Sequence, residues 1–76
     1  MTNLINIYLI NGEDFKCGLE NPCLYDLITL FLKKKIDDKC KLAVAVNNQL
    51  IEKNKWKRKK INLSDRIEIV SPFFGG

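Results

Sequence analysis

Few side chains in this sequence are suited to catalysis. The chain contains no histidine, so it lacks the commonest general base and the commonest metal ligand. The chain has three cysteines, Cys17, Cys23 and Cys40, with no CxxC spacing. A secreted disulfide scaffold normally uses an even number of cysteines. Without histidine, a cysteine nucleophile also lacks its usual activating base. We therefore expect free thiols in a reducing compartment.

The C-terminal residues are the most informative part of the sequence. Pro72 prevents a preceding strand from continuing in register, and Phe73 and Phe74 then stand where apolar residues have no core to enter. Gly75 and Gly76 have no side chains, so they can lie extended in a narrow channel. Gly-Gly alone fits a frayed end. The paired phenylalanines and the end of the sequence at Gly76 favour a working terminus.

A run of basic residues surrounds the single tryptophan, Trp56. The net charge is +4 and the pI is about 9.1, and six cations surround Trp56. A solvated loop is the commonest explanation of such a run, and steering toward an acidic partner is another. A nucleic-acid patch is a third interpretation, although one aromatic residue makes no stacking platform. A salt-sensitive oligonucleotide shift would test that alternative. The cations are Lys53, Lys55, Lys57, Arg58, Lys59 and Lys60.

Length and composition limit the function further. With 76 residues, 46% of them hydrophobic and 29% charged, the chain is expected to be one small globular domain. A domain of this size has no room for a core and a deep enclosed pocket, which argues against most enzyme classes. The longest apolar-rich stretch, residues 24–32, is too short to span a bilayer, and the N-terminus has no signal-peptide pattern.

Amino-acid usage bears on where the protein works. Lysine, asparagine and isoleucine together make up 28 of 76 residues, which suggests an AT-rich genome. The expected location is the cytoplasm, or the plastid stroma if the gene lies in the organelle.

Hydrophobic patterning predicts a hairpin followed by a helix. Residues 4–10 form an apolar, β-branched run that ends at Asn11-Gly12, the strongest short hairpin signal, and residues 14–18 complete the hairpin. Asn21-Pro22 predicts an N-cap and a first-turn proline for a helix over residues 23–35. The apolar stripe of this helix is Leu24, Leu27, Ile28, Phe31 and Leu32.

The second half of the chain predicts three more strands. Residues 42–46 form a buried strand, residues 50–51 a brief edge strand after a turn, and residues 66–70 a strand with one wetter face. One helix between a hairpin and later strands predicts an α+β fold of the β-grasp (ubiquitin-like) type, a mixed sheet with the helix packed on one face. We expect the domain to cover residues 1–71 and a flexible tail to cover residues 72–76.

The alternation of side chains along the first and last strands indicates a surface for a partner. We expect residues 5, 7 and 9 of the first strand to face the helix, which places Tyr8 and Ile10 on the opposite face with Glu68 and Val70. An exposed apolar face there would be a docking site. Tyr8 and Val70 are therefore predicted partner-binding residues, and solvent accessibility tests this.

Nearly the whole chain resembles the ThiS family, ubiquitin-like sulfur carriers of thiamine (thiazole) biosynthesis. The resemblance is clearest in VNNQLIEKNKW at residues 46–56 and SDRIEIVSPFFGG at residues 64–76. The last strand of the family reads Gly-Asp-x-Ile-x-Ile-Val before an apolar spacer and a terminal Gly-Gly. A tryptophan ten residues after Val-Asn is also typical of the family, where it is structural filler. We expect the same of Trp56.

The resemblance implies a protein cosubstrate, not an enzyme, with no bound cofactor of its own. A ThiF-type partner would use ATP and magnesium to adenylate the Gly76 carboxylate, and a cysteine desulfurase system would supply a persulfide that leaves a thiocarboxylate there. A ThiG-type thiazole synthase would receive the sulfur. Gly75 would help the tail to thread into these enzymes, and Phe74 and Phe73 would anchor it in apolar pockets. Alternatively, Phe73 folds back over Val70.

The resemblance leaves the sulfur acceptor open. Pro72 also resembles the tail of the molybdopterin synthase small subunit, and carriers for tRNA thiolation are similar. A small basic nucleic-acid-binding domain is the alternative from a different class. The free chain is expected to be a monomer with no membrane partner.

Overall fold

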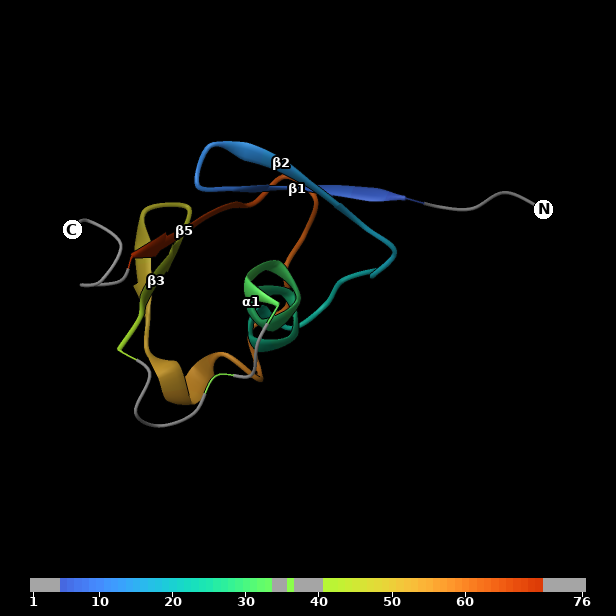
Figure 1. Cartoon of the computed structure of the whole chain (residues 1–76). Coiled ribbons are helices and arrows are strands. Elements are labelled where there is room, and N and C mark those ends of the chain that lie inside the picture. Colours follow the sequence, from blue (N-terminus) through green and yellow to red (C-terminus); the bar gives the residue numbers. More distant parts are fainter. Residues whose placement is uncertain (1–4, 34–35, 37–40, 71–76) are drawn as a thin grey trace.

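The computed structural model describes residues 5–33, 36 and 41–70. In this part of the chain a mixed sheet in the order β2-β1-β5-β3-β4 packs one face against helix α1 (Figure 1). The arrangement is the β-grasp fold that the patterning predicts. The elements are β1 (Asn6–Ile10), β2 (Glu13–Cys17), α1 (Leu24–Leu32), β3 (Ala43–Val46), β4 (Gln49–Ile51), the 3-10 turn η1 (Lys53–Lys55) and β5 (Arg66–Val70).

Two tight turns set the register of the outer strands. Asn11 and Gly12 have φ of 53° and 77°, and Asn47 and Asn48 have φ of 53° and 68°. Positive φ at both central residues defines the type I′ hairpin turn, which favours asparagine and glycine. The predicted Asn-Gly hairpin is therefore confirmed, and a second hairpin joins β3 to β4.

Strand directions place two chain exits at one end of the sheet. β1 is parallel to β5, whereas β3 is antiparallel to both β5 and β4. Val70 at the end of β5 pairs with Ala43, and Ile51 at the end of β4 pairs with the next residue, Val44. The chain therefore leaves β4 and β5 at the same end of the sheet, where β3 begins.

The core lies between the sheet and α1. Each large apolar side chain that is fully buried contributes about 1.5–3 kcal/mol relative to exposure. Phe15 of β2 and Phe31 of α1 border this core, with ring centroids 5.3 Å apart in an edge-to-face arrangement. The buried apolar residues are Tyr8, Ile10, Leu24, Leu27, Ile28, Ile36, Val44, Val46, Trp56, Ile61, Ile67 and Ile69.

The helix begins later than predicted, and other groups cap it. Cys23 is the N-cap and makes no side-chain capping hydrogen bond. Asn21, the predicted N-cap, has φ of 45°, and its side-chain amide donates to Asn62 Oδ1 at 2.9 Å. The Leu24 N–H instead donates to the carbonyl of Lys59 at 2.7 Å. A distant backbone segment therefore does the capping that local sequence assigned to Asn21.

The helix also ends earlier than predicted. Its last residue is Leu32, and Lys33 has φ of 59°, a left-handed C-cap whose N–H donates to the Thr29 carbonyl. Lys34 and Lys35, which the sequence assigned to the helix end, lie outside the described residues.

The predicted orientation of β1 is wrong. Tyr8 is 1% exposed and faces α1 together with Ile10, whereas Ile7 is 45% exposed on the opposite face. The Tyr8 hydroxyl donates to the Leu19 carbonyl at 2.8 Å, so its polar atom is satisfied on the buried side. Because the run LINIYLI is apolar on both faces, alternation alone cannot decide which face is buried.

Candidate functional site

The predicted site residues divide into three groups. Phe73, Phe74, Gly75 and Gly76 lie outside the described residues. Val70 is 61% exposed at the end of β5, so its predicted exposure is confirmed, and its role in partner binding stays a prediction. The burial of Tyr8 removes its side chain from any docking surface.

Strand β5, which leads toward the tail, is held on both sides. It lies between β1 and β3 in the middle of the sheet, and Ile67 and Ile69 point into the core. Asn11, in the turn after β1, adds two hydrogen bonds: its N–H donates to the Ile67 carbonyl at 2.8 Å, and its Oδ1 accepts from the Ile69 N–H at 2.7 Å. The position of Val70 is therefore fixed by the centre of the fold.

An asparagine and an aspartate fix the beginning of the same strand. Asp65 accepts from the Asn62 N–H and from Asn47 Nδ2, each at 2.9 Å. Asn47 Oδ1 in turn accepts from the Arg66 N–H at 2.9 Å. Asp65 is a buried polar residue, and these bonds satisfy its carboxylate. Both ends of β5 are thus tied to the two hairpin turns.

A partly apolar surface surrounds Val70 on the sheet face opposite α1. Val70 pairs with Ala43, and Glu68 pairs with Ala45, whose partner on β4 is Leu50. Leu50 is 68% exposed. We call Ala43, Ala45, Leu50 and Val70 the tail-end face. Leu50 was not predicted from the sequence as a site residue, although the Asn47-Asn48 turn before it fixes which way its side chain points.

The described residues contain no group of three or more Cys, Asp or Glu side chains positioned to hold a metal ion. Cys17 and Cys23 are free thiols and half-buried, and Cys40 lies outside the described residues.

Burial raises the pKa of Tyr8, and the nearby Cys17 acts in the same direction. Within the described ranges, no helix is long and apolar enough to cross a membrane.

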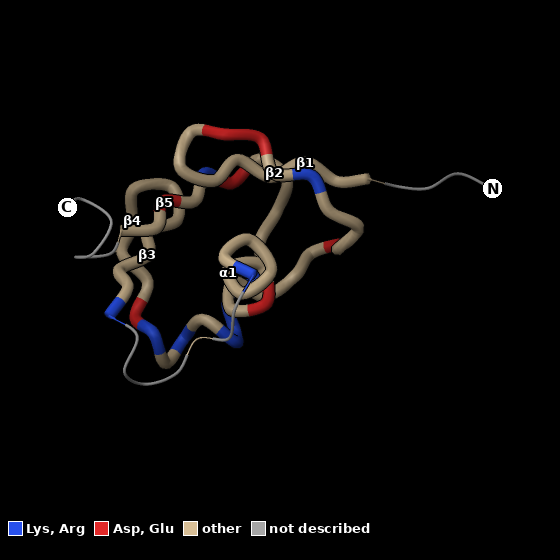
Figure 2. The backbone as a smooth tube through the Cα atoms, in the orientation of Figure 1, with Lys and Arg blue, Asp and Glu red and all other residues tan. Residues whose placement is uncertain are grey.

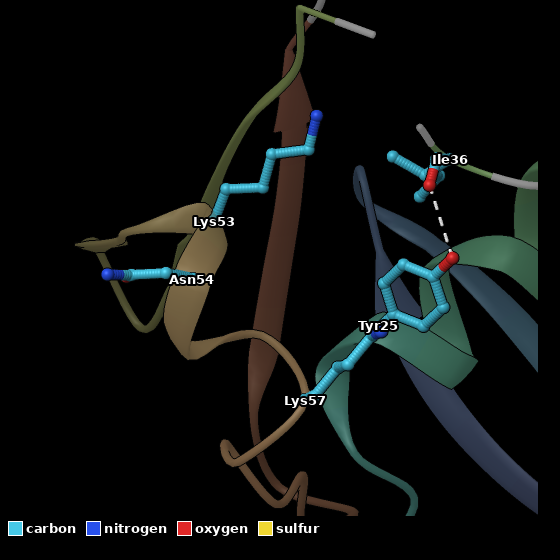
Figure 3. A pocket seen from close by; sticks show the side chains of 5 residues that line it. All are labelled: Tyr25, Ile36, Lys53, Asn54 and Lys57. Carbon is cyan, nitrogen blue, oxygen red and sulfur yellow. Dashed lines mark hydrogen bonds between the residues drawn. The ribbon is translucent and has the colours of Figure 1, made fainter. Parts of the chain in front are cut away.

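A hollow of about 390 Å³ lies between α1 and the segment around η1 (Figure 3). Tyr25 reaches into it from the helix, and its hydroxyl donates to the Ile36 carbonyl at 3.1 Å. Lys57 places its Nζ 4.9 Å from the centre of the Tyr25 ring, a cation–π contact. Lys53 and Asn54 complete the lining.

Trp56 lies in the core and belongs to the same chain segment as Asn54 and Lys57, which line the hollow. It is 1% exposed, and its Nε1 donates to the Ile51 carbonyl at 2.9 Å. Its predicted role as structural filler is confirmed. Trp56 also joins the end of β4 to the start of α1, because its indole bonds to Ile51 and its backbone carbonyl accepts from the Tyr25 N–H at 3.1 Å.

These features define a small protein of the β-grasp (ubiquitin-like) class, whose central strand β5 precedes Gly75-Gly76 in the sequence. The sequence model of the ThiS family matches residues 8–76, and the chain belongs to that family. The recognition from residues 46–56 and 64–76 is thereby confirmed.

The fold is similar to that of a solved relative. The crystal structure of the thiamine biosynthesis protein (ThiS) from Geobacter metallireducens matches with a TM-score of 0.66 and 16% identity, over 92% of this chain and 99% of that one. At this identity the likeness supports the fold alone. No curated protein sequence matches the chain.

Proposed function

We propose that this protein is a sulfur carrier for thiazole formation in thiamine biosynthesis, with the carboxylate of Gly76 as the group that carries sulfur. The observation that carries the proposal is the family match, which extends through Gly75 and Gly76. The protein is then a cosubstrate of other enzymes and binds no cofactor of its own. Its location is the cytoplasm, or the plastid stroma if the gene lies in the organelle.

The chemistry begins with activation of the Gly76 carboxylate. On a ThiF-type enzyme, a carboxylate oxygen attacks the α-phosphorus of ATP, and magnesium pyrophosphate leaves. The resulting acyl-adenylate has AMP as a good leaving group. A persulfide supplied by a cysteine desulfurase system attacks the acyl carbon with its outer sulfur and expels AMP. A second thiol then reduces the S–S bond, which leaves a thiocarboxylate on Gly76 and a disulfide between the two thiols.

The fold supports this role by holding the base of the tail. Six residues follow Val70, and an extended segment of that length reaches about 20 Å at most. The tail-end face at Val70 offers apolar contact to an enzyme while Gly75 and Gly76 occupy its channel. A domain boundary at residues 71–72 is consistent with the end of β5 at Val70. A ThiG-type thiazole synthase is the proposed acceptor.

Intact mass spectrometry tests the proposal. The chain is incubated with the ThiF-type enzyme of the same organism, ATP, magnesium, a cysteine desulfurase, cysteine and a reducing thiol. The expected result is a mass gain equal to replacing one oxygen by sulfur, located in the C-terminal peptide. A chain without Gly76 is the matched control and should show no gain. Absence of both adenylate and thiocarboxylate on the complete sequence would contradict the proposal.

Pro72 favours a second candidate for the enzyme that accepts the sulfur. Pro72 is a feature shared with the molybdopterin synthase small subunit. The two functions are distinguished by offering the thiocarboxylated chain to a ThiG-type synthase and, separately, to a molybdopterin synthase large subunit. Sulfur loss from the chain only with the second enzyme would assign the molybdopterin role. Loss with neither enzyme would direct the search to tRNA thiolation.

A further inference from the structure

Positive charge is concentrated in one segment of the molecule. Residues 53–60, which we call the basic ridge, hold six of the thirteen cationic residues and none of the nine acidic ones. The chain has a net charge of +4, so the remaining 68 residues together are net negative at −2. Figure 2 shows the ridge as a blue-rich stretch, away from the acidic start of β2, which holds Glu13 and Asp14.

The basic ridge is part of the fold and not a loose loop. Its backbone makes a 3-10 turn, and the carbonyls of Trp56 and Lys59 accept hydrogen bonds from the first two N–H groups of α1. The buried indole of Trp56 anchors the middle of the segment. The charges are therefore carried on a scaffold that is already ordered, so binding costs little additional backbone entropy.

The ridge has cations that no described carboxylate neutralises. Lys55, Arg58 and Lys60 are exposed, and none of them forms an ion pair with an acidic side chain in the part of the chain that the structure describes. Lys57 rests on the face of Tyr25, a contact with an uncharged ring that does not cancel its positive charge. Such a surface produces a positive field that extends about 10 Å into a solution of 0.1 M ionic strength.

The position of the ridge relates it to the tail. Its first residue, Lys53, comes two residues after Ile51, at the end of the sheet where Val70 also lies. From there the segment passes alongside α1 to the start of the helix, where Lys59 contacts Leu24. A partner that receives the tail therefore has the near end of the ridge within its footprint.

The aromatic residues at the ridge favour a protein partner over a nucleic acid. Single-stranded nucleic acids are bound by cations together with exposed aromatic faces on which bases stack. Trp56 is 1% exposed. Tyr25 is half-buried, its hydroxyl donates to Ile36, and Lys57 lies over its ring. Neither ring offers a stacking platform, whereas complementary charge alone is enough to steer two proteins together.

We infer that the basic ridge docks on an acidic surface of the enzyme that receives the C-terminal tail, close to the entrance of its channel. This inference rests on the proposed function and adds a second contact to the tail itself. The ridge orients the approaching carrier, so that a larger fraction of encounters brings the tail to the channel. Its main effect is on the association rate and on the sensitivity of that rate to salt.

The test measures association of the chain with the ThiF-type enzyme of the same organism by stopped-flow fluorescence over a range of salt concentrations. The ridge variant is Lys55→Glu with Arg58→Glu. The matched control is Lys16→Glu with Arg66→Glu, two exposed cations on strands outside the ridge. Both double variants have the same net charge. We expect the ridge variant to associate about tenfold more slowly or worse at low ionic strength, with a flatter salt dependence, and the control to change by less than about threefold.

Circular dichroism verifies that both variants are folded. The neutral pair Lys55→Gln with Arg58→Gln provides a second ridge variant with a smaller expected loss. Equal slowing of ridge and control variants would show that only net charge matters, and unchanged rates in both ridge variants would show that the ridge is not in the interface. Either result overturns the inference.

Two further measurements separate this inference from the proposed function. At saturating concentration, the ridge variant should still acquire the thiocarboxylate mass, because its tail is intact. A chain lacking Gly76 should lose that mass and keep the salt-dependent association. If the wild-type chain acquires no sulfur, the proposed function fails whatever the rates are. Tighter binding of the ridge to a single-stranded oligonucleotide than to the enzyme, at physiological salt, would assign the ridge to nucleic acid and overturn the inference.

Discussion

The side-chain oxygen of Asn11 accepts a hydrogen bond of 2.7 Å from the backbone N–H of Ile69, 58 residues later in the chain. Asn11 is in the turn that closes the first hairpin, and Ile69 is next to the last residue of β5. The turn residue therefore has two roles. Its positive φ allows the tight hairpin, and its amide holds the end of the strand that leads to the tail.

Replacing Asn11 should separate these two roles. Asn11→Gly keeps the positive φ but leaves the part-buried Ile69 N–H without its acceptor, which costs about 1–3 kcal/mol of unfolding free energy. Asn11→Asp keeps an acceptor and should lie closer to the wild type. Chemical denaturation gives the stabilities, and hydrogen exchange at Ile69 gives the local effect. Equal protection of Ile69 in both variants would contradict this account.

The single tryptophan provides a second test, since Trp56 fills the core and donates to the Ile51 carbonyl. Trp56→Phe should lose about 1 kcal/mol or more, because it removes the hydrogen bond and part of the packing. Trp56→Ala should lose about 3–5 kcal/mol. In the wild type, the emission of the indole should shift to longer wavelength on unfolding. A wild-type emission already typical of water would contradict the burial of Trp56.

Tyr8 makes stability sensitive to alkaline pH. Burial raises the pKa of its hydroxyl above the ordinary value of about 10, so the folded state holds this proton more tightly than the unfolded state does. The corresponding stabilisation is fully present below pH of about 10 and is lost as the pH rises through the folded-state pKa.

Tyr8→Phe should therefore remove this component of the stability loss at alkaline pH. Near neutral pH the variant should be about 0.5–1.5 kcal/mol less stable, since it lacks the hydrogen bond to the Leu19 carbonyl. Above pH of about 10 the difference from the wild type should shrink. Denaturant titrations at both pH values measure it, with Tyr25→Phe as the control. A difference that stays constant with pH would count against a role for Tyr8 ionisation.

Local signals made much of this fold predictable. Asn11-Gly12 fixed the first hairpin because only a few residue types accept positive φ at low cost. The apolar stripe that includes Leu24, Leu27 and Ile28 predicted a helix with one buried face, and those three residues are buried. The alternation of β5 predicted which of its residues enter the core, and Ile67 and Ile69 do so.

The features that sequence missed depend on distant parts of the chain. The N-terminus of α1 is capped by the carbonyl of Lys59, which no local pattern could indicate. The buried face of β1 was assigned wrongly because both faces of that strand are apolar, and the deciding contact of Tyr8 is with the Leu19 carbonyl. The Gly-Gly tail was recognised from its residue types and from the family resemblance, and Gly75 and Gly76 lie outside the described residues.

The tail-end face can be tested through two exposed apolar residues at opposite ends of β5. Val70, at the end of the strand, is 61% exposed, and Leu63, before its start, is 56% exposed. Both side chains are mostly in solvent, so aspartate at either position should change stability by about 0.5 kcal/mol or less. Val70→Asp places a charge where the proposed enzyme contact lies, and burying an unpaired charge there should weaken binding to the ThiF-type enzyme about tenfold or more. Leu63→Asp should leave the dissociation constant within about twofold of the wild type. Titration calorimetry with both variants measures the constants, and equal weakening by the two would show that the enzyme does not distinguish the two ends of β5.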